Sequence, residues 1–206
     1  MHVLFGRLRS RQRYTPADIT PYMRINGYPP ESPEYRKLAE GGFADWRLKV
    51  EGLVERPAAL SLADLRALPR QEQITMHNCI QGWSGIVQWA GVQVMQVLEL
   101  CRPLPSAQYI VFYAFMQEEY APQSYYEAFS LKEMDDPQTI LAYEMNWRPL
   151  PIPHGAPCRL RIETKVGYKM VKYLRSIELV TTLNEVGEGH GGYREDYQYY
   201  DKEAMI

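Results

Sequence analysis

The sequence has few cysteines, almost no net charge and no long apolar run, and each shortage excludes a class of protein. Three cysteines in 206 residues are too few for a disulfide framework, so a reducing compartment is expected. A net charge of -2 argues against a dedicated nucleic-acid binder. No run of about 18 apolar residues is present, so no membrane-spanning segment is predicted. The first residues lack a signal-peptide pattern, which favours a cytoplasmic location.

The near-neutral total hides three charged blocks. Residues 1–13 contain four arginines and no acid, whereas residues 185–206 contain six acids and two basic residues. Both ends are interpreted as solvated tails, with mutual pairing or the clamping of a partner as alternatives. The chain then divides into a basic segment at 1–19, a domain at 20–184 and an acidic, Tyr- and Gly-rich tail at 185–206. Residues 159–175 hold six basic side chains and one acid, which indicates an anion site, with a solvated surface strand as the equal alternative.

Hydrophobic periodicity predicts short strands and helices without a βαβ rhythm. Strands are expected at 46–52, 73–76, 109–115, 159–163 and 176–180, and a buried helix at 91–100. Ser61 and Ser130 each stand three residues before an acid and are predicted to cap short helices. Asn146 and Trp147 indicate a hairpin-like turn, and residues 14–45 are expected to wrap the domain in extended form. The predicted fold class is α+β, one domain with mixed or antiparallel sheets and short helices.

Common catalytic motifs are missing, since the sequence has no P-loop, dinucleotide fingerprint, HExxH, Gly-x-Ser-x-Gly or Cys-x-x-Cys. The remaining candidate for a catalytic site is the stretch 77–79, which directly follows a predicted strand and precedes a turn that contains glycine. A Cys79 thiolate there would be a nucleophile, a redox switch or a metal ligand, the alternative being a buried inert thiol. His77 lies on the same side of an extended strand, where it would lower the thiol pKa, contact a ligand or bond only to backbone. The other cysteines, Cys101 and Cys158, are interpreted as core thiols.

Five segments, in order along the chain, carry a resemblance to a known family. They are Trp46-x-Leu-x-Val-x-Gly with Leu60-Ser-Leu-x-Asp, Cys79-Ile-Gln-Gly-Trp-Ser84 with Trp89-x-Gly-Val, Pro137-Gln-Thr-Ile-Leu-Ala-Tyr-Glu-Met-Asn146, Pro149-Leu-Pro with His154-Gly-Ala-Pro-x-Arg-Leu160, and Gly167-Tyr-Lys-Met-Val-Lys172. Together they resemble the sulfite-oxidase-type molybdopterin-binding domain, and within that family they are similar to bacterial molybdenum-dependent methionine-sulfoxide reductases. The resemblance covers residues 20–182 and implies that the α+β domain is one molybdopterin-binding oxidoreductase domain.

The resemblance implies an oxidoreductase that holds molybdenum with one pyranopterin and moves an oxygen atom to or from a small substrate. Cys79 is implied as the only protein ligand of the metal, because a soft thiolate suits a centre that a dithiolene already holds. His77 is implied, with Cys79, to act at the reacting centre. The basic block then has a partner, since the pyranopterin ends in a phosphate. The implied cofactor-binding residues are Asn26, His77, Cys79, His154, Arg159, Lys169, Met170, Val171 and Lys172.

The direction of the chemistry stays open between reduction of an S-oxide or N-oxide and a sulfite-like oxidation. No Cys-x-x-Cys-His haem motif is present, so a separate redox partner is expected to carry the electrons. No dimerisation domain is recognisable, which favours a monomer. Two other interpretations remain. The chain could be a non-catalytic carrier of the molybdenum cofactor, or a metal-free hydrolase with Cys79 as nucleophile and His77 beside it.

Overall fold

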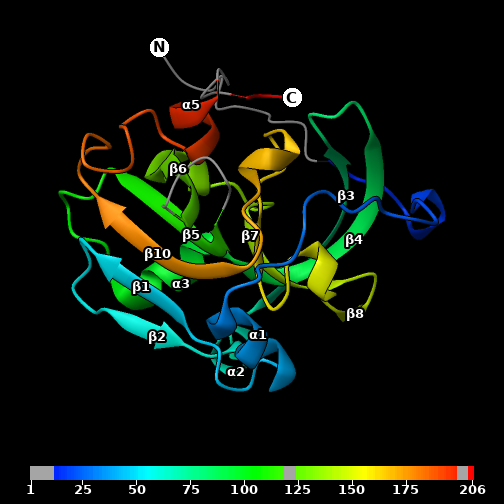
Figure 1. Cartoon of the computed structure of the whole chain (residues 1–206), viewed down its shortest axis with the longest axis horizontal. Helices are drawn as coiled ribbons and strands as arrows, with labels where there is room; N and C mark the ends of the chain where they lie inside the picture. Colours follow the sequence, from blue (N-terminus) through cyan, green and yellow to red (C-terminus); the bar gives the residue numbers. More distant parts are fainter. Residues whose placement is uncertain (1–11, 118–123, 199–203) are drawn as a thin grey trace, which may run out of the picture.

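The computed structural model describes residues 12–117, 124–198 and 204–206, and within these ranges it contains two sheets and short helices (Figure 1). The strands of the first sheet are β1 (Leu48–Gly52), β2 (Ala58–Leu60), β5 (Tyr109–Gln117), β6 (Ser124–Ser130) and β10 (Leu174–Val180). Those of the second are β3 (Arg70–Asn78), β4 (Ser84–Gln93), β7 (Ile140–Met145), β8 (Arg148–Pro149) and β9 (Arg159–Arg161). The helices are α1 (Pro33–Glu40), α2 (Leu62–Ala67), α3 (Val94–Cys101), α4 (Leu131–Met134) and α5 (Tyr193–Tyr197), with 3-10 turns η1 (Pro16–Asp18), η2 (Ile152–His154) and η3 (Gly167–Lys169).

The two sheets have mixed and antiparallel topology. The first sheet has the order β2-β1-β10-β5-β6, in which β1 and β10 run parallel while β10 and β5 run antiparallel. The second has the order β3-β4-β7-β8, with β9 paired antiparallel to β7. Both the predicted α+β class and the mixed sheets are therefore confirmed. No helix of the described ranges is long and apolar enough to cross a membrane.

The two capping boxes predicted from the sequence are both present at helix starts. At the start of α2 the Ser61 hydroxyl accepts a bond from the backbone N–H of Asp64, while the Asp64 carboxylate accepts one from the N–H of Ser61. Ser130 and Glu133 form the same type of capping box before α4. Each box satisfies N–H groups that a helix start leaves without partners, which is why three-residue spacing is informative.

Two predicted elements differ from the structure, one in where it starts and one in its conformation. The helix expected at 91–100 starts only at Val94, since residues 91–93 continue β4 and pair with β7. Gly91 permits this pairing, because an added Cβ would overlap the carbonyl oxygen of Leu141. The segment expected to be extended between 14 and 45 includes α1, which Ser32 caps by accepting the N–H of Tyr35 at 3.3 Å.

The hydrophobic core divides into a large cluster and a small one. Trp46, Phe112 and Leu174 are fully buried in the large cluster, where Trp46 Nε1 donates to the Leu174 carbonyl at 2.9 Å. The small cluster packs on the second sheet around Trp89 and includes Met23 from the N-terminal segment. Cys101 and Cys158 are core thiols, as predicted, since both are fully buried and neither forms a disulfide.

Both terminal regions fold onto the domain where the structure describes them. Thr20 donates its N–H to Ile86 of β4 at 2.9 Å. At the other end, Tyr193 of α5 is fully buried, and the Tyr126 hydroxyl of β6 bonds to Asp196 (Figure 1). The prediction of a solvated C-terminal tail is therefore wrong for residues 192–197, because aromatic burial and this bond hold them against β6. Residues 1–11 and 199–203, which carry most of the remaining tail charge, lie outside the described residues.

Candidate functional site

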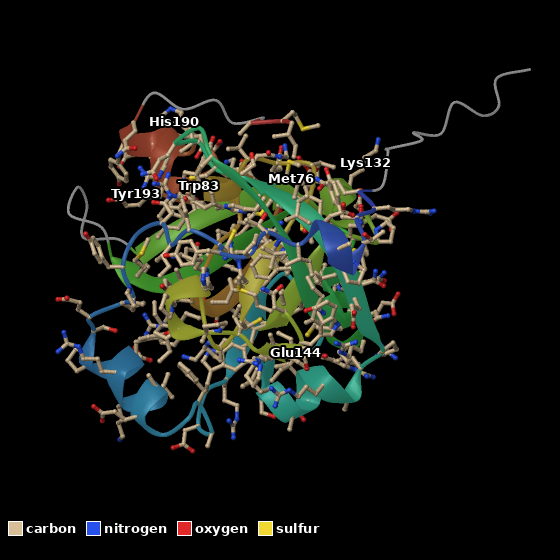
Figure 2. All side chains as sticks on the ribbon, turned by 90° about the vertical axis from the view of Figure 1, so that its right-hand side faces the viewer. Met76, Trp83, Lys132, Glu144, His190 and Tyr193 are labelled. Atoms are coloured by element: carbon tan, nitrogen blue, oxygen red, sulfur yellow. The ribbon has the colours of Figure 1, made fainter. Side chains whose placement is uncertain are left out.

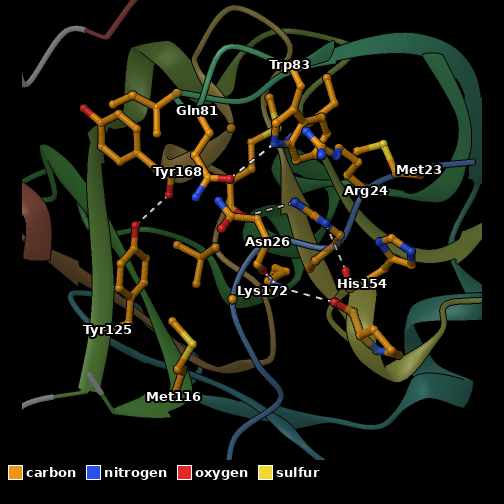
Figure 3. Close-up of a pocket in the computed structure, with 18 of the residues that line it drawn as sticks. Met23, Arg24, Asn26, Gln81, Trp83, Met116, Tyr125, His154, Tyr168 and Lys172 are labelled. Atoms are coloured by element: carbon orange, nitrogen blue, oxygen red, sulfur yellow. Dashed lines mark hydrogen bonds between the residues drawn. The ribbon is translucent and has the colours of Figure 1, made fainter. Parts of the chain in front are cut away.

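A pocket forms where the N-terminal segment, the end of β3, η2, η3 and α5 come together (Figure 3). Trp83 lies at this end of the molecule in Figure 2, with Glu144 toward the opposite end. Most of the residues that the resemblance implies line this pocket, although they come from separate parts of the chain. They are Asn26, His77, His154, Arg159, Met170, Val171 and Lys172.

Cys79 is not among the residues that line this pocket; it lies next to them, in the turn that follows β3, before Ile80 and Gln81, which do line it. The turn is closed by two backbone bonds, from Cys79 N–H to the Trp83 carbonyl and from Gly82 N–H to the Cys79 carbonyl. The thiol is 8% exposed, and Asn26 Nδ2 donates to its sulfur at 3.5 Å. Asn26 therefore lies at the thiol, as the resemblance implies. No group of three or more His, Cys, Asp or Glu in the described ranges could hold a metal, so Cys79 is a single soft donor.

Arg159, Lys172 and His154 form a cluster of basic groups in the pocket wall. Lys172 Nζ donates to the Asn26 carbonyl at 2.6 Å, and Arg159 donates to the His154 carbonyl at 2.9 Å. Burial and Arg159 lower the pKa of Lys172 to about 7, and burial with the same arginine lowers the pKa of His154 to about 4. Burial, with Arg161 as the nearest repelling charge, also lowers the pKa of Arg159 to about 9. The groups repel each other's charge, as an anion site without its anion should.

The hydrogen bonds of Arg159 indicate where an anion would bind. Its Nε is buried and has no hydrogen-bond partner, and neither Arg159 nor Lys172 forms an ion pair within the described part of the chain. An unsatisfied buried donor is costly, and a phosphate oxygen would satisfy it with a charge-assisted bond. The Arg159 guanidinium also stacks over Trp89, with 5.0 Å from Cζ to the ring centroid. Stacking fixes its plane and so orients the donors.

His77 is held by a buried ion pair that the sequence analysis did not foresee. Arg161 bonds to Glu163 through Nε at 3.0 Å and through a terminal nitrogen at 2.6 Å, and its other terminal nitrogen lies 2.8 Å from His77 Nδ1. An arginine can only donate, so Nδ1 accepts and the ring proton is on Nε2. Burial, together with the charge of Arg161, lowers the pKa of His77 to about 2.

A neutral His77 argues against the hydrolase interpretation. Its Nδ1 is occupied by Arg161, and its low pKa makes it a very weak base toward a thiol. The opposite edge of the ring faces Gly167, where an added Cβ would overlap Cε1 and Nε2 of the imidazole. Only glycine lets η3 approach β3 this closely. His77 therefore acts in the structure as a hydrogen-bonding group that sets the spacing of the pocket walls.

Lys169 differs from the residues around it. The resemblance implies that it binds the cofactor phosphate, but its ammonium lies behind the pocket and is fully buried. There it pairs with Glu127 at 2.6 Å and with Glu195 at 2.6 Å. Its positive charge is thus balanced inside the protein and does not add to the anion site of Arg159 and Lys172.

The pocket also contains residues that the sequence analysis did not assign. They are Arg24 and Met23 from the N-terminal segment, Trp83 and Gln81 from the cysteine turn, Tyr125 from β6, Tyr168 from η3 and Arg194 from α5. Tyr168 and Trp83 lie inside two of the segments that carry the resemblance, so the sequence could have predicted them as pocket residues. Arg24 and Arg194 had no such signal, because only the folding of both terminal segments brings them to the pocket.

Comparison with known proteins gives three findings. The family model described as "Oxidoreductase molybdopterin binding domain" matches residues 36–186. A chain of Azospira oryzae, provisionally named a protein-methionine-sulfoxide reductase subunit, is 35% identical over 79% of this chain and 57% of that one. The protein-methionine-sulfoxide reductase catalytic subunit of Xanthomonas campestris is 30% identical over 82% and 55%, respectively. The chain thus spans little more than half the length of these relatives.

A solved structure supports the fold. The sulfane dehydrogenase SoxCD from Paracoccus pantotrophus superposes with a TM-score of 0.59 and 23% identity, over 68% of this chain and 39% of that one. At this identity the likeness concerns the arrangement of the elements alone.

Proposed function

This chain belongs to the oxidoreductase molybdopterin binding domain family, and from that premise we propose that it is a molybdenum-dependent reductase of S-oxides. The proposed reaction removes the oxygen atom of an S-oxide, such as methionine sulfoxide, in a two-electron step. The observation that carries the proposal is that the Cys79 thiol and the basic groups of Arg159 and Lys172 adjoin one pocket, linked through Asn26. The names of two similar reductase subunits favour S-oxide reduction over N-oxide reduction or a sulfite-like oxidation.

The residues of the pocket fit a molybdenum atom with one pyranopterin. Arg159 has a buried donor without a partner, and Lys172 has a pKa that a bound anion would restore, so a terminal phosphate suits both. The backbone of Met170 and Val171, next to these side chains, would complete the phosphate site. Cys79 would ligate the metal through its sulfur, which is the donor type that a high-valent centre accepts.

The cofactor, when bound, would supply the two-electron redox chemistry. The chain would bind it and orient the substrate. Asn26 Nδ2 would hold the Cys79 sulfur in place through its hydrogen bond. The Trp83 ring packs against His77 with 5.6 Å between ring centroids, so it would help to hold the imidazole in the pocket wall. Neutral His77 would offer its Nε2 proton as a donor rather than supply a proton to the reaction.

A separate redox partner is proposed to supply the electrons. The support is that the similar Xanthomonas campestris protein is named a catalytic subunit, a word that implies a further component. The small-molecule or side-chain S-oxide would enter through the open pocket. The cytoplasmic location and the monomeric state stay predictions.

The decisive experiment measures metal content and turnover together. Full-length protein made in a host that synthesises the cofactor is expected to contain about one molybdenum and one pterin per chain. With a reduced dye as donor it should convert methionine sulfoxide to methionine. Cys79→Ser is expected to lose this turnover, because a hydroxyl is a harder and weaker ligand than a thiolate. Cys101→Ala, in the core away from the pocket, serves as the matched control and should keep it.

Two results would contradict the proposal in different ways. Wild-type protein without molybdenum would refute the cofactor assignment. Protein with molybdenum that reduces no S-oxide, N-oxide or related substrate would instead favour the carrier.

A further inference from the structure

A buried trio of charged side chains lies directly behind the pocket. Glu127 comes from β6, Lys169 from η3 and Glu195 from α5, so three distant parts of the chain meet there. The side chains of Glu127 and Lys169 are fully buried, and that of Glu195 is 2% exposed. The lysine ammonium bonds to both carboxylates at 2.6 Å. Glu195 lies beyond the part of the chain that the family model matches.

The trio contains two carboxylates but only one ammonium, so a fully ionised trio would carry a net charge of about -1 in the protein interior. Two carboxylates share a single ammonium, and Glu195 Oε2 is buried without a hydrogen-bond partner. This atom and Glu127 Oε2 both face Gly192, where an added Cβ would overlap the two oxygens. The carboxylates therefore approach each other across the space of one missing side-chain carbon. A second buried carboxylate this close disfavours the ionised form of Glu127.

The groups that face Glu127 account for the direction in which its pKa moves. They are Tyr125 of β6, Lys169 of η3 and Glu195 of α5, with the Tyr126–Asp196 bond next to them. Burial is the largest cause and Glu195 adds to it, which together outweigh Lys169 and raise the pKa of Glu127 to about 8. The nearby Arg194 donates to Gln198 at 2.6 Å.

Two tyrosines connect the trio to the pocket. The Tyr125 hydroxyl lies 3.0 Å from Glu127 Oε1, and the Tyr168 hydroxyl lies 3.0 Å from Glu195 Oε1. Both tyrosines line the pocket (Figure 3). The Tyr125 hydroxyl also donates to the Tyr168 carbonyl at 2.7 Å. It can therefore donate to an ionised Glu127, or accept from a protonated Glu127 while it donates to that carbonyl.

We propose that Glu127, beside Glu195 and Lys169, stores one proton and that Tyr125 passes it to the substrate in the pocket. The inference rests on the proposed function, because S-oxide reduction consumes two protons and two electrons. The sulfur–oxygen bond breaks, the sulfur gains the electron pair that the redox partner supplies, and the oxygen leaves as water. One proton comes from the Tyr125 hydroxyl, which Glu127 then reprotonates, and the other comes from solvent at the open pocket. Glu195 and Lys169 are positioning residues for this stored proton.

The stored proton is tested directly by infrared spectroscopy of the full-length holoprotein during a pH titration. A carboxylic-acid carbonyl band is expected at neutral pH, and it should disappear as the pH rises through about 8. Glu127→Gln and Glu195→Gln are each expected to remove this band. Glu185→Gln, which changes an exposed carboxylate of the same terminal region, should keep it. A band that persists in both buried variants, or that is absent from the wild type, would overturn the stored proton.

Turnover tests the transfer step. Tyr125→Phe and Glu127→Gln are expected to lower kcat by about a hundredfold, the size typical of losing a positioned proton donor, with KM unchanged. The wild-type kcat is expected to decline above pH 8, and both variants should lose this decline. Molybdenum content equal to wild type shows that the pocket is intact. Tyr125→Phe with wild-type kcat and pH profile at full molybdenum content would refute the route.

The outcomes separate this inference from the proposed function. A wild-type chain that reduces no S-oxide refutes the function, and with it the transfer step, whereas the infrared band still decides whether Glu127 holds a proton. A chain that reduces S-oxides while the variants behave as wild type refutes only the proton route. If Glu127→Gln does not fold, Glu195→Gln and Tyr125→Phe test the same two steps, because each keeps the size of the original side chain.

Discussion

Lys172 is expected to make anion binding in the pocket depend on pH. Burial and the neighbouring Arg159 lower its pKa to about 7, whereas an ordinary lysine has a pKa near 10.4. An anion beside both groups offsets their repulsion and stabilises the ammonium form. Binding therefore takes up a proton when the pH is above about 7, and the affinity falls as the pH rises through that value.

The size of the effect follows from the fraction of Lys172 that is protonated. With a pKa of about 7, roughly nine-tenths of the side chains carry the proton at pH 6 and roughly one-tenth at pH 8. If only the ammonium form binds the anion, the affinity falls about tenfold between these values, which is ~1.4 kcal/mol. The neighbouring His154 and His77, with pKa values of about 4 and about 2, stay neutral throughout. Arg159, with a pKa of about 9, stays mostly charged up to pH 8, so Lys172 is the main group that titrates in this range.

Sulfate is the suitable probe, because it stays a dianion over the whole range. Calorimetric titration would use the full-length chain from a host that cannot make the molybdenum cofactor. The wild type is expected to bind sulfate about tenfold more weakly at pH 8 than at pH 6, with proton uptake that varies with the ionisation enthalpy of the buffer. Lys172→Met is expected to bind weakly and without pH dependence. Lys132→Met, which removes an exposed lysine, should match the wild type.

Two results would refute this reasoning. A wild type that binds sulfate equally at pH 6 and pH 8 would show that Lys172 keeps its proton in this range. A Lys172→Met variant with wild-type affinity at pH 6 would show that the anion binds elsewhere.

Two further substitutions test the structure around the pocket by urea unfolding, each with a matched control. Gly167→Ala forces a methyl group into the His77 ring, so it should lower the free energy of unfolding by about 1–3 kcal/mol, whereas Gly41→Ala, whose nearest atom would be 3.5 Å away, should change it little. A Gly167→Ala chain as stable as wild type would contradict the close approach of η3 to β3. Glu163→Gln leaves the buried charge of Arg161 unpaired and should cost about 3–5 kcal/mol, while Glu34→Gln breaks an exposed pair with Arg175 and should cost under about 1 kcal/mol. Equal effects of these two changes would refute the buried role of Glu163.

Sequence patterns were reliable wherever a few neighbouring residues decide the outcome. The capping boxes at Ser61 and Ser130 depend on bonds between residues three positions apart, and the turn at Asn146 joins strand residues three and five positions apart, so local spacing predicts them. The order of motifs also indicated the family, and the cysteine turn was placed at the end of a strand. Seven of the residues that the resemblance implies line the pocket.

Only the tertiary structure decided which distant groups share a charge or a bond. Lys169 and Lys172 are three positions apart in one basic block, yet one is neutralised by two acids in the interior and the other faces the pocket. The neutrality of His77 depends on Arg161, which lies 84 positions away. The same holds for α5, since the burial of Tyr193 and the bond between Tyr126 and Asp196 fix a segment that its composition predicts to be solvated.

The sequence by itself therefore determined the local elements, the family and the identity of the candidate ligands. The tertiary structure decided which of the charged residues act together, because burial and long-range pairing set their ionisation. A pKa depends on how much water and how many charges lie within a few ångströms. Those neighbours come from strands and turns that the chain brings together only when it folds.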